Sequence, residues 1–244
     1  MGCKLIINSS NPPIKCQLFT NRSKPSFGIK TLAFSSNYKP DQDPISTINI
    51  STSYDDDDDV ATTIKFKTLG ACKLGISRFP DFEYDAQGGT GTGTGTGSDD
   101  DDNKELIWVS FDLKTLYIPP LTSETTKFLG LPLPPLLKID IVPQLFQGNI
   151  NQKSGQVDLE FMAKFWFSVG SIYRAPPLMV KTVLTSEESK GTMRSGRGER
   201  LDKQGKCRLV GVATVDPIDD SFMNTFLGLP TECLAILNAV IHLS

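Results

Sequence analysis

The sequence predicts a mainly β protein, folded as an antiparallel barrel or a strongly curved sheet with two short helices. The clearest observation is an alternation of apolar odd positions and mostly polar even positions from residue 157 to residue 169. A period of two over thirteen residues is typical of a long strand with one buried face. Residues 107–113 alternate in the same way, and residues 208–215 and 231–243 are also expected to be extended.

Two predicted turns favour antiparallel pairing of these strands. Residues 151–155 begin with Asn and end with Gly, and residues 202–205 begin with Asp and end with Gly. Such segments suit type I turns that close on a glycine in the left-handed conformation. Long alternating strands joined by hairpins indicate a closed or strongly curved sheet rather than a parallel α/β fold.

The two helices are predicted from a repeated pentapeptide, Phe-Leu-Gly-Leu-Pro, at residues 128–132 and 226–230. Polar residues precede each copy, and Ser or Asp before an apolar turn commonly caps a helix N-terminus. Glycine followed by proline commonly ends a helix. We therefore expect a short helix to end at each copy, although a coincidental repeat of a common helix end is the alternative.

A Gly/Thr stretch and four aspartates occupy residues 88–102. This composition has high backbone entropy and little to bury, so it predicts a disordered insertion within a single antiparallel β domain spanning residues 60–244. It is not a phosphate-binding loop, because the required Lys does not follow the closing glycine.

The charge balance makes binding to nucleic acid unexpected. Residues beyond position 40 contain 28 acids and 19 bases, a net charge of −9, and nine of the acids belong to two aspartate runs. Without those runs acids and bases are equal in number, so the folded part has little overall charge to attract a polyanion. No apolar run approaches the roughly 18 residues of a membrane-spanning helix.

The first 40 residues lack Asp and Glu but carry six bases and eight Ser or Thr residues. This acid-free, hydroxyl-rich leader resembles the transit peptide of a nuclear-encoded plant plastid protein. The resemblance implies that residues 1–50 are a plastid transit peptide and disordered leader. It also implies a chloroplast location, either in the stroma or peripheral to the thylakoid.

The sequence shows no catalytic constellation and predicts neither a cofactor nor a metal site. The only histidine, His242, lies next to the end of the chain, where we expect a partly buried structural role rather than that of a base. Asp216, Asp219 and Asp220 are close in sequence, but helix capping and a turn explain them without a metal. Three scattered cysteines beyond the leader are expected to be buried.

The most suggestive polar segment is rich in arginine and glycine. Arginine side chains beside exposed backbone amides can bind a phosphate, a sulfate or a lipid head group. The predicted ligand- or anion-binding residues are Arg174, Arg194, Arg197 and Arg200. Acidic residues are interspersed, so a salt-bridged hairpin is the alternative.

Trp108 and Trp166 fall on the polar face of their predicted strands. A large aromatic side chain in such a position needs cover, which the two short helices, a partner or a bilayer surface would supply. We expect cover from within the protein, with an interface as the alternative.

These observations favour a protein without catalysis of its own that binds an apolar or amphiphilic ligand, such as a lipid, or a thylakoid assembly partner. Peripheral contact with the thylakoid membrane is part of this expectation. One alternative is a small isomerase or cyclase that uses Tyr173, Arg174 or Asp140 instead of histidine. The other is a structural accessory subunit with the tryptophans at its interface. The oligomeric state is not indicated.

Overall fold

A computed structural model describes residues 62–97 and 105–244 of the chain. These residues form fifteen β-strands and one short helix, which confirms the prediction of a mainly antiparallel β protein. The predicted transit peptide at residues 1–50 lies outside the described residues, as do residues 98–102 of the predicted insertion.

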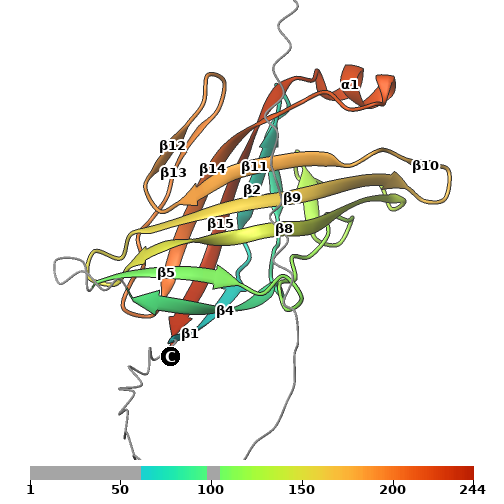
Figure 1. The fold of residues 1–244 in the computed structure, drawn as a ribbon. Coiled ribbons are helices and arrows are strands. Elements are labelled where there is room, and N and C mark those ends of the chain that lie inside the picture. Colours follow the sequence, from blue (N-terminus) through green and yellow to red (C-terminus); the bar gives the residue numbers. More distant parts are fainter. Residues whose placement is uncertain (1–61, 98–104) are drawn as a thin grey trace, which may run out of the picture. The chain divides into compact units, whose positions relative to one another are not determined.

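Eight antiparallel strands pair in a closed ring (Figure 1). In ring order they are β1 (Thr62–Thr68), β4 (Thr90–Gly97), β5 (Leu106–Phe111), β8 (Leu137–Asn151), β9 (Val157–Val169), β11 (Leu178–Thr185), β14 (Lys206–Val215) and β15 (Thr231–Leu243). The ring closes where β1 pairs with the second half of β15.

The first half of β15 pairs instead with β2 (Cys72–Ile76), so the sheet branches at this strand. From β2 it continues through β3 (Phe82–Tyr84), β6 (Thr126–Phe128) and β7 (Leu131–Pro132). The remaining strands are β10 (Tyr173–Arg174), which pairs with β9, and a separate hairpin of β12 (Glu188–Lys190) and β13 (Ser195–Arg197). The helix α1 (Ser221–Leu227) precedes β15.

Strand β9 has the predicted bounds and the predicted inward face. Its odd-numbered side chains are buried along the first half of the strand and line the interior of the ring along the second half. The two predicted turns, at residues 151–155 and 202–205, are also confirmed. Asn151 and Asp202 each accept hydrogen bonds from following backbone amides, and Gly155 and Gly205 have φ angles of 72° and 77°.

The disordered insertion predicted at residues 88–102 is wrong for residues 90–97, which form β4 between β1 and β5. The run Thr-Gly-Thr-Gly itself has a period of two, with threonines outside and glycines inside. A Cβ on Gly93 would lie 2.6 Å from the Ser110 carbonyl oxygen, and one on Gly95 would lie 2.7 Å from Ile107. Glycine is therefore required there, because the core packs directly against the β4 backbone.

Only the second pentapeptide copy ends a helix. Helix α1 ends within residues 226–230, at Leu227; its N-cap is Asp220, and its C-cap is Gly228 with φ 65°. The first copy is instead a hairpin, because Thr126–Phe128 pairs with β3 and Leu131 pairs back to Phe128. Sheet pairing has overridden the local helix signal, and the feature that the copies share is a glycine in the left-handed conformation.

Packing fills one end of the ring. Phe66, Phe111, Phe146 and Phe161 pack ring against ring with centroid separations of 4.6–5.9 Å, and small aliphatic side chains from β1, β5, β9 and β15 surround them. The opposite end, toward α1, β3 and β7, is bordered by two separate apolar clusters. The interior is thus solid at one end and lined but unfilled at the other.

The role of β4 gives the first testable prediction. Gly93→Val should lower the free energy of unfolding by about 1–3 kcal/mol, because the added methyl groups force the β4 and β5 backbones apart. Thr94→Val, one residue away and exposed, should change it by less than about 0.5 kcal/mol. Urea denaturation of both variants makes the comparison. Equal stabilities of the two variants would contradict the pairing of β4 between β1 and β5 as a strand of the ring.

Candidate functional site

The main candidate site is an apolar cavity of about 530 Å³ at the unfilled end of the ring. Its base is formed by Phe66, Phe146 and Phe161, the same side chains that cap the packed end. Strands β8, β9, β11, β14 and β15 supply the walls, and α1, β3 and the β6–β7 hairpin border the mouth. The cavity is therefore a continuation of the core that side chains leave open.

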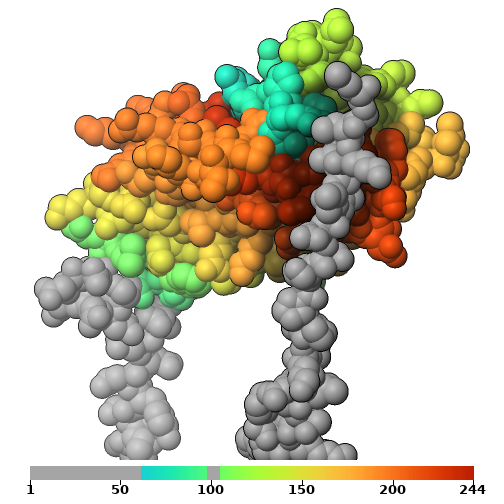
Figure 2. All heavy atoms as spheres, turned by 90° about the horizontal axis from the view of Figure 1, so that it is seen from above, coloured from blue at the N-terminus to red at the C-terminus, as the bar shows by residue number. Residues whose placement is uncertain are grey.

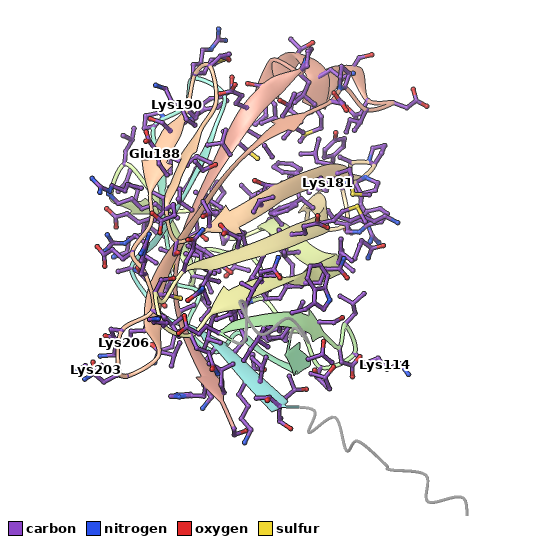
Figure 3. All side chains as sticks on the ribbon, turned by 60° about the vertical axis from the view of Figure 1, so that its left-hand side comes forward. Lys114, Lys181, Glu188, Lys190, Lys203 and Lys206 are labelled. Carbon is purple, nitrogen blue, oxygen red and sulfur yellow. The ribbon has the colours of Figure 1, made fainter. Side chains whose placement is uncertain are left out.

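Alternation along the strands makes the wall apolar. On β11, Val180 and Thr182 face the cavity while Lys181 between them is exposed (Figure 3). On β14, Ala213 faces the cavity and Thr214 faces solvent. Gly211 of the wall packs directly against neighbouring side chains, since a Cβ there would lie 2.9 Å from Leu184 and from Thr182.

The polar side chains that line the cavity already have partners in the protein. The Tyr84 hydroxyl donates to the Pro119 carbonyl oxygen, and Thr182 Oγ1 donates to the Val212 carbonyl oxygen at 2.8 Å. Burial raises the pKa of Tyr84 above its usual value and raises the pKa of Cys233 to about 11, so both stay neutral near pH 7. The cavity presents neither a charge nor an unpaired polar side chain to a ligand.

Helix α1 covers part of the mouth. Met223 and Leu227 are buried against the cavity, one turn apart on the same side of the helix. Asp220 holds the helix in place, since its carboxylate accepts from the Met223 amide at 2.8 Å and from the Tyr173 hydroxyl at 2.6 Å. These hydrogen bonds lower the pKa of Asp220. Desolvation, together with the hydrogen bond to Asp220, raises the pKa of Tyr173 to about 12.

The arginine-rich segment forms the β12–β13 hairpin, whose central amides bind a carboxylate of the protein itself. Glu232 of β15 accepts hydrogen bonds from the amides of Thr192, Met193 and Arg194 at 2.7–2.9 Å, and from the Thr192 hydroxyl at 2.7 Å. These donors lower the pKa of Glu232 to about 2. Sequence reasoning missed Glu232 because a single acid within a predicted strand gives no signal of its distant partner.

Arg194 is also committed to contacts within the protein. Its side chain is only 12% exposed and forms an ion pair with Asp81 at 2.5 Å. The same guanidinium donates to the Ser77 carbonyl oxygen at 2.8 Å and to the Phe79 carbonyl oxygen at 2.6 Å. Arg194 thus ties the β12–β13 hairpin to the loop between β2 and β3, as the salt-bridged alternative requires.

The other predicted arginines do not converge on one site. Arg200 forms an ion pair with Glu187 at 2.6 Å, and Arg197 is exposed on β13. Arg174 lies on β10, at the opposite end of the described structure from the hairpin in Figure 1. Binding of an external anion by these residues stays a prediction, without a shared pocket to support it.

The two tryptophans lie on the outer face of the ring. Trp108 is 43% exposed, so the expected cover by short helices is wrong for this residue. Trp166 is partly covered by Arg174, whose guanidinium carbon lies 4.7 Å from the centre of the indole ring. This cation–π contact places Arg174 in a surface role, and an interface at Trp108 stays a prediction.

The residues proposed for a histidine-independent enzyme do not line the cavity. Asp140 points outward and pairs with Lys138 at 2.7 Å, Tyr173 binds Asp220, and Arg174 covers Trp166. Glu232 and Asp220 have lowered pKa values, the opposite of a buried acid poised to donate a proton. His242 is exposed rather than partly buried as expected, because it lies on the outer face of β15.

No known protein family, curated protein or solved structure matches this chain. Within residues 62–97 and 105–244, no cluster of three or more His, Cys, Asp or Glu side chains has a geometry that would hold a metal ion. In that part of the chain, no helix has the length and the apolar character that crossing a membrane requires.

Glu232 gives a prediction on pH. Its pKa is about 2 in the folded protein and about 4.5 when unpaired, so its ionisation stabilises the fold fully above pH 4.5. This contribution should be lost as the pH falls from about 4.5 to about 2. Glu232→Gln should lower the urea midpoint at pH 7, because the side-chain NH₂ group of Gln cannot accept hydrogen bonds from the backbone amides. The difference in midpoint from wild type should shrink as the pH falls from about 4.5 to about 2.

Glu160→Gln is the matched control for this measurement, because Glu160 is an exposed carboxylate on the outer face of β9. It should follow the wild-type curve at every pH. A Glu232→Gln midpoint that stays lower by a constant amount down to pH 2 would contradict a role for the Glu232 charge.

Proposed function

We propose that the ring of eight strands is a barrel that binds an apolar small molecule, or the hydrocarbon part of an amphiphilic one. The observation that carries this proposal is the cavity of about 530 Å³ whose polar side chains are all satisfied within the protein. Its volume lies within the range of about 300–1,000 Å³ typical of small-molecule sites. Fatty acyl and isoprenoid chains fit its chemistry, because they require no hydrogen bonds.

An apolar ligand is favourable in this cavity. Water solvates the wall poorly, because ordered water needs two or more polar partners and the lining side chains are nearly all apolar. A hydrocarbon that enters removes apolar surface from water, at about 25 cal/mol per Å², and adds dispersion contacts with the wall.

A polar head group, where the ligand has one, is placed at the mouth. The base of the cavity is closed by the Phe66, Phe146 and Phe161 cluster, so a ligand enters from the end that α1 borders. Burying an unpaired polar group in such a wall costs several kcal/mol, which excludes sugars, nucleotides and free amino acids as occupants of the interior. The selectivity is therefore for hydrocarbon character and size.

The proposed location is the plastid, and the support for it is the acid-free composition of residues 1–40. Residues 1–60 fused to a fluorescent reporter should enter chloroplasts. Cytosolic or mitochondrial fluorescence would contradict this address without affecting the proposed ligand.

The ligand proposal is tested by filling the cavity. Ala213→Phe places a phenyl ring in the cavity, whereas Thr214→Phe places the same ring on the outer surface of the same strand. Binding of the neutral fluorescent probe N-phenyl-1-naphthylamine should weaken at least about tenfold in Ala213→Phe, equivalent to about 1.4 kcal/mol, and should be unchanged in Thr214→Phe.

The melting temperature separates this effect from misfolding. Ala213→Phe should melt at or above the wild-type temperature, because the new ring fills empty space. Wild-type protein that fails to bind the probe, or an Ala213→Phe variant that binds it as wild type does, would refute the ligand-binding proposal. If the probe binds as expected, native mass spectrometry of protein purified from its source organism would identify the class of the bound hydrocarbon.

A further inference from the structure

Exposed apolar side chains surround the mouth of the cavity. We call this set the mouth rim: Leu129, Leu131, Leu136, Ile172, Phe222 and Phe226. Leu129 and Leu131 are each 70% exposed and Ile172 is 83% exposed. These residues come from the β6–β7 hairpin, the segment before β8, the β9–β10 turn and α1, and Figures 1 and 2 both place those segments at the same end of the described structure.

The mouth rim is continuous with the cavity wall. Leu129, Leu131 and Phe226 are exposed to solvent and also line the cavity. Phe226 stacks on Phe222 with a centroid separation of 5.7 Å and contacts Phe79 at 5.6 Å. One apolar surface therefore runs from the interior of the ring to the outside, without a polar border at the opening.

Helix α1 has apolar side chains on two sides. Met223 and Leu227 are buried against the cavity, whereas Phe222 and Phe226, one turn apart, are exposed to solvent, with Phe226 at the edge of the opening. A soluble helix that packs on a core normally turns polar side chains to water. Exposed phenylalanines next to an apolar opening instead suit the interfacial region of a bilayer, where aromatic side chains are favourable.

Leu129 has a left-handed backbone conformation that is unfavourable for leucine. The β6–β7 turn has φ angles of 52° at Leu129 and 79° at Gly130, so both central residues are left-handed. A two-residue hairpin turn of this kind favours Asn-Gly, because Asn tolerates the left-handed conformation far better than Leu. A strained leucine that is 70% exposed contributes little to the core, so its apolar side chain serves a different purpose.

Charges near the mouth rim are balanced. Within five positions of its residues in sequence lie three bases and four acids: Lys127, Lys138, Arg174, Glu124, Asp140, Asp219 and Asp220. Electrostatic adsorption to an anionic surface requires an excess of bases, which this end of the structure lacks. This charge balance suits a lipid bilayer whose surface carries no net charge.

We propose that the mouth rim docks on the surface of a bilayer of neutral lipids, with its side chains inserted among the lipids and the cavity open to the acyl phase. This inference rests on the proposed function, because a hydrocarbon ligand without polar groups moves from bilayer to cavity along a continuous apolar path. A bilayer suits the geometry better than a protein partner, since the exposed apolar side chains come from four separate segments around the opening of the cavity.

Vesicle flotation with phosphatidylcholine tests the proposal. The full chain should float with neutral vesicles in low and in high salt, and adding phosphatidylglycerol should change binding little. The double variant Leu129→Asn/Ile172→Asn should weaken vesicle binding at least about tenfold, because it replaces two of the most exposed apolar side chains of the mouth rim with polar ones. Its melting temperature should not fall, because Asn suits the left-handed turn position.

Met193→Asn is the matched control, since Met193 is 60% exposed at the tip of the β12–β13 hairpin, away from the mouth rim. Its binding should equal that of wild type. Probe binding, measured on the same proteins, separates the two proposals. Wild-type protein that binds the probe but does not float would overturn bilayer docking and leave the cavity function intact.

Three other results would also overturn the docking proposal. The first is binding that requires anionic lipid and disappears in high salt, which would show electrostatic adsorption. The second is a rim double variant that floats like wild type. The third is a wild-type dimer, measured by size exclusion with light scattering, that dissociates in the rim double variant, because a second copy would then cover the mouth rim.

Discussion

The arrangement of the interior depends on how one edge of β15 is shared between two strands. Its second half pairs with β1 and closes the ring, whereas its first half pairs with β2 and sends the sheet outward. The Asn238 side chain lies at the break between the two partners and donates to the carbonyl oxygens of Gly70 and Ala71. The branch places β2 and β3 beside the unfilled end of the ring, where their side chains line the cavity.

An apolar interior of this size is stable only if polar groups around it are satisfied elsewhere. Arg194 and Glu232 do this at the outer surface, where each binds backbone groups of a loop that would otherwise be unpaired. Together they fix the β12–β13 hairpin and the β2–β3 loop on the first half of β15. Arg194, one of the residues that suggested an anion site, is thus engaged within the protein, and the wall of the cavity remains free of charge.

Local pattern predicted the elements whose partners are close in sequence. Strand β9 and the turns at Asn151 and Asp202 are specified by alternation and by turn chemistry within a few residues, and the structure agrees with them. Strand β4 was mistaken for disorder because its glycines look permissive in isolation. Their necessity appears only when β5 and the core pack against them.

The candidate site was harder to predict, because it is made by distant pairing. The first pentapeptide copy became a hairpin through contact with β3, some forty residues earlier in the chain, and this contact places Leu129 and Leu131 at the mouth. Glu232 and Arg194 likewise meet their partners only through the order of strands in the sheet. The ligand class stays a prediction, which depends on the general property that a curved sheet with alternating faces turns its apolar side chains inward.

Helix α1 joins the inside of the ring to its outside. Seven residues are too few for a helix to be stable alone, so α1 depends on its cap at Asp220 and on the burial of Met223 and Leu227. The outward phenylalanines follow from the same helical spacing, since Phe222 and Phe226 each precede a buried residue. A ligand that fills the cavity adds contacts to the buried side of α1. Because its seven residues make only about two turns, contacts on the buried side also fix the position of the exposed aromatic side, so we expect the proposed ligand and the mouth rim to be coupled through α1.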